Sequence, residues 1–158
     1  MKIIRPVYRA IVIEAGLLSL LVWQMLSGFR LLVHRWRNND GIIAWLQIIS
    51  GAYLALFLII HVCSVLFART YLGIDTNFNF AAAGLHTPNG ALFFIPYYTG
   101  SFLALFTHIG CAISWRFYSD NHTAQLRWIM LCSGTGLIIG ILVVMGLSGV
   151  LYDVKLPS

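Results

Sequence analysis

Four long hydrophobic segments, separated by polar turns, account for most of this chain of 158 residues. They cover about residues 9–34, 42–68, 93–115 and 126–151. A helix needs about 20 predominantly apolar residues to cross the hydrocarbon core of a bilayer, and each segment is that long. The pattern therefore predicts an all-α polytopic membrane protein, a four-transmembrane-helix bundle that forms a single domain over 1–158.

The connections between the predicted helices differ in length. Loops 35–41 and 116–125 are short, whereas loop 69–92 is long, nearly uncharged and rich in Asn, Ala, Gly and aromatic residues. A loop of that length usually has a function of its own or packs against the rest of the fold. We expect it to cover part of one end of the bundle.

Composition agrees with a lipid environment, because 59% of the residues are hydrophobic and only 9% are charged. The formal net charge of +5 does not indicate a nucleic-acid partner, since the arginines cluster where hydrophobic segments end, as cations do at lipid head groups. We therefore expect membrane lipid as a partner and no nucleic acid. The cations are denser around loops 35–41 and 116–125, which predicts that these loops are cytoplasmic in a protein of a bacterial inner membrane.

Two histidines lie inside predicted spans, where an ionisable side chain points to a functional site. His61 in the second segment shares a helical face with Gln47 and Ser50. His108 in the third lies on a stripe that also includes Tyr97, Ser101, Ala104, Ala112 and Trp115. Small residues near a histidine leave room for a flat cofactor, and haem b is the leading candidate because neutral imidazole is a common axial ligand. Close helix packing explains the same pattern without a cofactor.

In antiparallel helices the two histidines would differ in depth by about 10 Å, which favours two haems over one haem held between them. Each haem then needs a second ligand, and the fourth segment contains no histidine. The candidates are His34, His86, Met145 or a histidine of another subunit. Zinc is less well supported, because no carboxylate or thiolate is spaced to complete a tetrahedral site.

Small residues recur at two other places. Gln24-x-x-Ser27-Gly28 in the first segment is repeated as Gln47-x-x-Ser50-Gly51 in the second, which indicates helix packing or, alternatively, a head-group or quinone pocket. The fourth segment has Gly136-x-x-x-Gly140, a spacing that favours tight helix association within the chain or between chains.

The second and third segments also resemble a known family. The stretch 45–62, WLQIISGAYLALFLIIHV, and the stretch 102–108, FLALFTH, are similar to the first two haem-bearing helices of the succinate dehydrogenase and fumarate reductase cytochrome b subunits. The resemblance covers about residues 45–115. It implies that His61 and His108 are axial ligands to the iron of two different b haems, one near each membrane face. This chain departs from the family in having four helices where the family has five.

We therefore expect a cytochrome-b-like membrane subunit that binds haem b and passes electrons to or from quinone, with Gln47, Ser50 and Arg37 on the quinone side. The chain has no nucleophile or hydride-cofactor motif, so it would act as a subunit of an oxidoreductase or a homo-oligomer rather than as an enzyme alone. The alternatives are a haem-free structural or assembly subunit, and a small carrier or proton-conducting bundle that uses Glu14 and His61.

Overall fold

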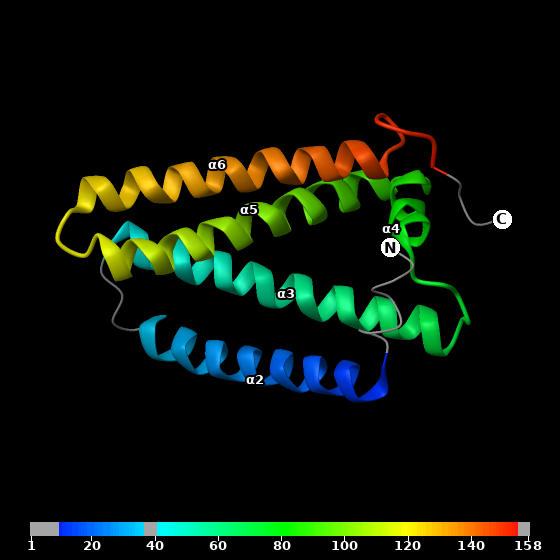
Figure 1. Cartoon of the computed structure of the whole chain (residues 1–158), viewed down its shortest axis with the longest axis horizontal. Coiled ribbons are helices and arrows are strands. Elements are labelled where there is room, and N and C mark those ends of the chain that lie inside the picture. Colours follow the sequence, from blue (N-terminus) through cyan, green and yellow to red (C-terminus); the bar gives the residue numbers. More distant parts are fainter. Residues whose placement is uncertain (1–9, 37–40, 155–158) are drawn as a thin grey trace. The chain divides into compact units, whose positions relative to one another are not determined.

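The structure, a computed structural model, describes residues 10–36 and 41–154 (Figure 1). The chain divides into two compact units, residues 1–39 and residues 40–158. Arg37, predicted to belong to a quinone-side cluster, lies outside the described residues. The described residues form helices and no strand, so the predicted all-α class is confirmed.

The first unit contains one long helix, α2, over Ile11–Trp36. It begins two residues later and ends two residues later than predicted. None of the residues in its most apolar window is buried, and Trp23 is 74% exposed. A helix that is apolar on every face is typical of a membrane span.

The second unit contains three more helices of membrane-spanning length: α3 (Ile42–Thr70), α5 (Gly90–Phe117) and α6 (His122–Leu147). Between α3 and α5 lie a short helix, α4 (Phe78–Ala83), and one turn of 3-10 helix, η1 (Gly84–His86). Helix α5 packs against both α3 and α6 and therefore forms the centre of this unit (Figure 1).

Glycines on α6 bring its backbone close to α5. A methyl group at Gly136 would lie 2.6 Å from the carbonyl oxygen of Phe102, and one at Gly140 would lie 3.0 Å from the Cα of Thr99. In the same interface, the Thr107 and Ser133 hydroxyls are hydrogen bonded at 2.7 Å. The Gly136-x-x-x-Gly140 spacing thus serves packing within the chain, one of the two roles that the sequence left open.

Local capping explains where the helix ends differ from the prediction. Helix α6 stops at Leu147 although apolar residues continue to Leu151, because Gly149 has φ 82° and Val150 donates its N–H to the Met145 carbonyl. These are the features of a Schellman motif. At its other end α6 begins at His122 rather than in a longer loop, since the Asn121 side chain accepts a hydrogen bond from the Ala124 N–H at 2.9 Å.

The long loop is partly helical and covers one end of α5 and α6, as expected. Its buried residues Ala82 and Leu85 pack with Leu147 of α6. Partly buried aromatic side chains, among them Phe78 and Phe94, surround this cluster. The sequence did not predict α4, because six residues are too few to show a helical period.

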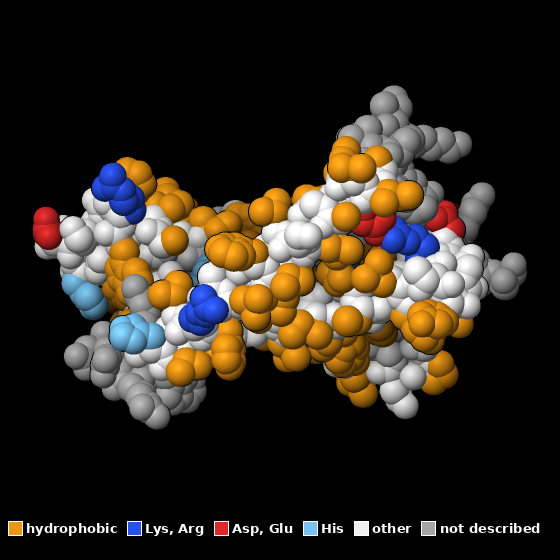
Figure 2. Space-filling model, turned by 90° about the horizontal axis from the view of Figure 1, so that it is seen from below, with side chains coloured by type: hydrophobic (Ala, Val, Ile, Leu, Met, Phe, Trp, Pro, Cys, Tyr) orange, Lys and Arg blue, Asp and Glu red, His pale blue; other side chains and the backbone are white. Residues whose placement is uncertain are grey.

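Hydrophobic side chains are widely exposed on the outside of these helices (Figure 2). On α6, for example, Met130 is 64% and Ile138 is 61% exposed. Soluble proteins seldom expose apolar surface on this scale. Within residues 10–36 and 41–154, four helices are long and apolar enough to cross a membrane, so the chain is an integral membrane protein whose outer faces contact lipid.

We predict that Gly136→Ala destabilises the second unit by about 1–3 kcal/mol relative to Gly134→Ala, because the added methyl overpacks the α5–α6 interface. Gly134 has no heavy atom within 4 Å of an added Cβ, so its variant gains the same helix propensity without the clash. The measurement is the free energy of unfolding of both variants in bicelles. Equal stabilities would contradict the close packing.

Candidate functional site

His108 of α5 is held against α3 by two polar groups. Its Nδ1 lies 3.2 Å from the carbonyl oxygen of Gln47 and 3.2 Å from the hydroxyl oxygen of Ser50. Ser50 is buried, and its hydroxyl also lies 3.1 Å from the same carbonyl oxygen, to which it donates. The predicted grouping of Gln47 and Ser50 with a histidine is therefore present, but the histidine is the one on the neighbouring helix.

The contact with the Gln47 carbonyl favours one tautomer of His108. A carbonyl oxygen only accepts hydrogen bonds, so a bond to Gln47 requires the proton on Nδ1, and Nε2 then has a free lone pair. The Ser50 hydroxyl, which would donate to Nδ1 in the other tautomer, is placed to donate to the Gln47 carbonyl instead. Among the described residues, none forms a hydrogen bond with Nε2. A histidine oriented in this way is prepared to bind a metal or to accept a proton through Nε2.

A glycine makes room for the ring. A methyl group at Gly51 would lie 3.1 Å from Cε1 of His108, which is tighter than ordinary van der Waals contact. The Gln-x-x-Ser-Gly sequence of α3 therefore has a definite use: its carbonyl orients the imidazole, and its glycine allows the imidazole to approach. In the repeated sequence on α2, the Ser27 hydroxyl donates to the Gln24 carbonyl of its own helix.

The side chain of Gln47 adds an unsatisfied acceptor to this region. Its Oε1 is buried and has no hydrogen-bond partner among the described residues. In the hydrocarbon region no bulk water can supply the missing donor, so an unpaired polar atom there costs free energy. A ligand, a partner chain or a bound water with a donor group would relieve that cost.

His61 has a different environment on the same helix. Its half-buried ring stacks on Phe57, with centroids 5.4 Å apart and an interplanar angle of 15°. Phe57 in turn contacts Tyr97 of α5, whose hydroxyl donates to the Phe57 carbonyl at 3.3 Å. In the described part of the chain, neither ring nitrogen of His61 has a hydrogen-bond partner. Both nitrogens are thus available to a ligand, a partner chain or a bound water molecule.

The two histidines lie at different levels of the membrane span. His108 meets α3 at Gly51, and His61 is ten residues further along that helix, which corresponds to about 15 Å at the rise of an α-helix. The predicted difference in depth is therefore present. The two rings do not face one common ligand.

The remaining predicted ligands are placed elsewhere. His34 is exposed on α2 and belongs to the other unit. His86 in η1 lies with its Nε2 3.2 Å from the carbonyl oxygen of Leu147, so in this structure its N–H caps the end of α6. Met145 is half-buried near that same end of α6.

The predicted stripe on α5 holds along only part of the helix. Tyr97, Ser101 and Ala104 are buried on the way to His108, whereas Ala112 is exposed. From Thr107 onward the buried face turns to Thr107, Cys111 and Ser114. The cause is the mismatch between 3.6 residues per turn and steps of three or four, which rotates a straight stripe around the helix.

Tyr53 is a site neighbour that the sequence did not single out. Its hydroxyl donates to the Pro96 carbonyl at 3.0 Å, and its ring covers Gly100, where a side chain would clash with it. Gly100 inside a span was a usable signal for the close approach of a neighbouring helix. Tyr53 therefore fixes α3 on α5 between the levels of His108 and His61.

The described side chains that could ligate a metal are compatible with a haem site. Among the described residues, no three His, Cys, Asp or Glu side chains come close enough to hold a metal ion between them. A haem needs fewer protein ligands, because the porphyrin supplies four nitrogens and the protein one or two axial ligands. The oriented Nε2 of His108 fits an axial ligand, and the space at Gly51 fits the close approach of its ring.

The hydrogen bonding around His108 can be measured by a double-mutant cycle. We predict that Ser50→Ala and His108→Leu are coupled by about 0.5–1.5 kcal/mol in the free energy of unfolding, as is usual for hydrogen bonds between membrane helices. Ser114→Ala is the matched control, since Ser114 is also buried and donates to the carbonyl three residues earlier. Its coupling to His108→Leu should be near zero. Equal coupling for both serines would refute the contact.

Comparisons of the chain with protein-family models, with curated proteins and with solved structures found no match.

Proposed function

We propose that this chain is a membrane-embedded, cytochrome-b-like subunit that binds haem b and passes electrons to or from quinone within a larger oxidoreductase. The observation that carries the proposal is the His108 imidazole. Its Nδ1–H is held by the Gln47 carbonyl, and its Nε2 keeps a free lone pair inside a membrane span. Histidines that bind metals usually donate their other ring N–H to such a carbonyl.

His61 supports a second haem at another level. It is half-buried in the span of α3, and neither of its ring nitrogens has a hydrogen-bond partner among the described residues. Iron coordination would satisfy one nitrogen, and a backbone or partner group the other. A separation of about 15 Å along α3 is compatible with two haems and not with one haem bridged by both histidines.

Bound haem supplies one-electron redox chemistry. The residues of this chain bind and orient it. The Gln47 carbonyl orients the His108 ring, Gly51 leaves space for that ring because it has no side chain, and the apolar helices exclude water. A low-dielectric surrounding and the hydrogen bond on the ligand both tune the potential of a haem.

Second axial ligands are expected from outside the α3–α5 pair. The source that we propose is a histidine of another subunit or of a second copy of this chain. His86 is a weaker source than the sequence indicated, because its Nε2 contacts the Leu147 carbonyl. A chain that provides one ligand for each haem fits a subunit that functions only in an assembly.

On the quinone side we propose Gln47 and Ser50. The support comes from the buried Oε1 of Gln47, which has no partner among the described residues and could accept a hydrogen bond from a quinol hydroxyl. For the orientation we propose that the two short loops face the cytoplasm of a bacterial inner membrane. Arg116 and Arg127 at the ends of α5 and α6 support this orientation.

A haem-free structural subunit is the second candidate, and one observation favours it. His108 fills the space at Gly51 and bonds to α3, which is also what a packing residue would do. Such a subunit would use both histidines only to join helices. The absorption of the purified protein distinguishes the two functions.

The test is the visible spectrum of the full chain, expressed with haem supplied and purified in mild detergent. We predict a Soret band in the wild-type protein and loss of about half of the bound haem in His61→Leu and in His108→Leu, because each histidine serves its own haem. His122→Leu is the control, since His122 is exposed at the start of α6. It should keep the full haem content.

Wild-type protein without a Soret band would overturn the proposal in favour of the structural subunit. So would unchanged haem content in both histidine variants. A complete loss of haem in either single variant would instead show one shared haem.

A further inference from the structure

Helix α2 repeats the face of α3 that holds the His108 ring. On α3 this face consists of Ile43, Gln47, Ser50, Gly51 and Leu54. On α2 the same intervals are occupied by Leu20, Gln24, Ser27, Gly28 and Leu31. Both segments are continuous α-helix, so residues at equal intervals have the same arrangement on the two helix surfaces. We call the second set of residues the α2 repeat face.

The copy on α3 shows what such a face binds. The carbonyl oxygen of Gln47 and the hydroxyl oxygen of Ser50 each lie 3.2 Å from Nδ1 of His108. Gly51 leaves space for the ring, since a methyl group there would lie 3.1 Å from Cε1 of His108. Ile43, only 6% exposed, packs with Cys111, which follows His108 by one turn of α5. The α3 face therefore binds an imidazole that a neighbouring helix presents.

The α2 repeat face has the same local structure without an imidazole. The Ser27 hydroxyl donates to the Gln24 carbonyl at 2.9 Å, just as the Ser50 hydroxyl donates to its own helix at 3.1 Å. Beyond the local helix backbone, no heavy atom of the described residues lies within 4 Å of a methyl group placed at Gly28. Leu20, the counterpart of the buried Ile43, is 66% exposed. The position that corresponds to the His108 ring is therefore open on α2.

The repeat face lies within a membrane span, which makes a hydrogen bond to it effective. Gln24, Ser27 and Gly28 all belong to the apolar segment Ile11–His34. In the hydrocarbon region no bulk water competes for the Gln24 carbonyl or for an incoming imidazole N–H. An imidazole on a second membrane helix would satisfy its own N–H there and, at the same time, place a small polar ring where Gly28 leaves room for it.

We propose that the α2 repeat face binds a histidine on a transmembrane helix of another polypeptide, with the imidazole Nδ1–H donating to the Gln24 carbonyl and the ring lying over Gly28. The occupied copy on α3 supports this partner, because its ligand is also a histidine on a helix. The Nε2 of the bound imidazole remains free. Its use as a haem ligand rests on the proposed function, whereas the binding itself does not.

The test measures how tightly the full chain binds a synthetic transmembrane peptide in phosphatidylcholine vesicles without haem, at about pH 8, where imidazole is neutral. The probe is a Lys-flanked polyleucine helix with one histidine near its centre, and the reference peptide has leucine at that position. Förster transfer between dyes on the chain and on the peptide reports binding. We expect the wild-type chain to bind the histidine peptide about fivefold more tightly, as one hydrogen bond between membrane helices predicts.

Gly28→Leu should abolish that preference, because its side chain occupies the place of the ring. Gly16→Leu is the matched control. Gly16 is also exposed on α2 and open to an added Cβ, but the positions that correspond to Gln24 and Ser27 hold Val12 and Ala15. The control variant should keep the preference. Circular dichroism checks that both variants retain their helix content.

Equal binding of the two peptides by the wild-type chain would overturn the proposal, as would an equal loss of preference in both glycine variants. Self-association of the chain that Gly28→Leu alone removes would also overturn it, since a second copy would then occupy the face. Because the measurement contains no haem, a missing Soret band and a missing peptide preference are separate results. The first contradicts the proposed function, and the second contradicts the binding of a partner histidine to α2.

Discussion

The lack of water in the hydrocarbon core of the bilayer is the constraint on which the rest of this structure depends. Every polar group inside a span must find its partner within the protein, because no solvent is present to provide one. Backbone groups meet this requirement by forming helices. Side chains meet it through short-range bonds, such as the Ser and Thr hydroxyls that donate to carbonyls three or four residues earlier. The few polar atoms that remain unpaired are therefore informative.

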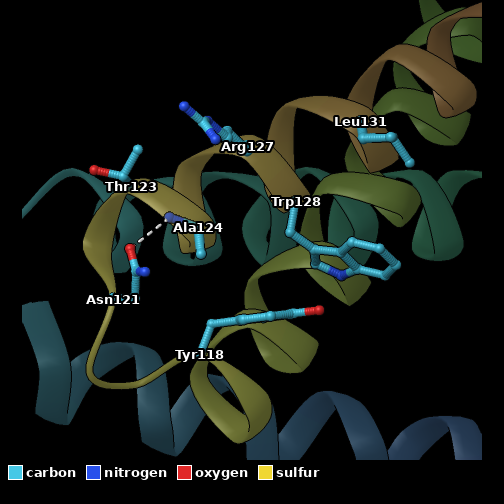
Figure 3. Close-up of a pocket in the computed structure, with 7 residues that line it drawn as sticks. All are labelled: Tyr118, Asn121, Thr123, Ala124, Arg127, Trp128 and Leu131. Atoms are coloured by element: carbon cyan, nitrogen blue, oxygen red, sulfur yellow. Dashed lines mark hydrogen bonds between the residues drawn. The ribbon is translucent and has the colours of Figure 1, made fainter.

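The same constraint makes His108 the most informative residue of the chain. Its Nδ1 is satisfied by the Gln47 carbonyl, and that bond leaves the lone pair of Nε2 without a partner among the described residues. Both ring nitrogens of His61 also lack a hydrogen-bond partner among the described residues, and so does the Oε1 of Gln47. These three groups occur on the α3–α5 pair, and on α6 the buried Nε1 of Trp128 (Figure 3) also lacks a partner among the described residues. Midway along the α5–α6 pair, Thr107 and Ser133 close the polar contact between the two helices. The proposed chemistry accordingly belongs to α3 and α5, and α6 stabilises α5 from the other side.

The length of the hydrophobic segments was sufficient to predict the four spans, because a bilayer requires about 20 apolar residues whatever the packing. It did not predict the ends of α6, since Asn121 and Gly149 decide them through local hydrogen bonds and a positive φ. It also missed α4, whose six residues are too short for a period. Helix-end positions depend on one or two residues, and hydropathy averages over many.

The candidate site, too, was predicted only in part from the sequence. Sequence singled out both histidines because each is costly in lipid, and it singled out Gln47 and Ser50 because they lie on one face of α3. It grouped those two residues with His61 on one face of α3, and the structure adds their contacts with His108 of α5. The register between α3 and α5 decides this, and that register depends on contacts such as Tyr53 over Gly100, which no local pattern contains.

The tautomer of His108 provides the most direct test of the account. Solid-state NMR of protein labelled with ¹⁵N-histidine, reconstituted in lipid without haem, distinguishes a protonated Nδ1 from a protonated Nε2, and the His108→Leu variant assigns the signal. The account predicts that Nδ1 carries the proton and Nε2 does not. A proton on Nε2 would contradict it, because the lone pair of the ring would then lie on Nδ1, the nitrogen that faces Gln47 and Ser50 of α3.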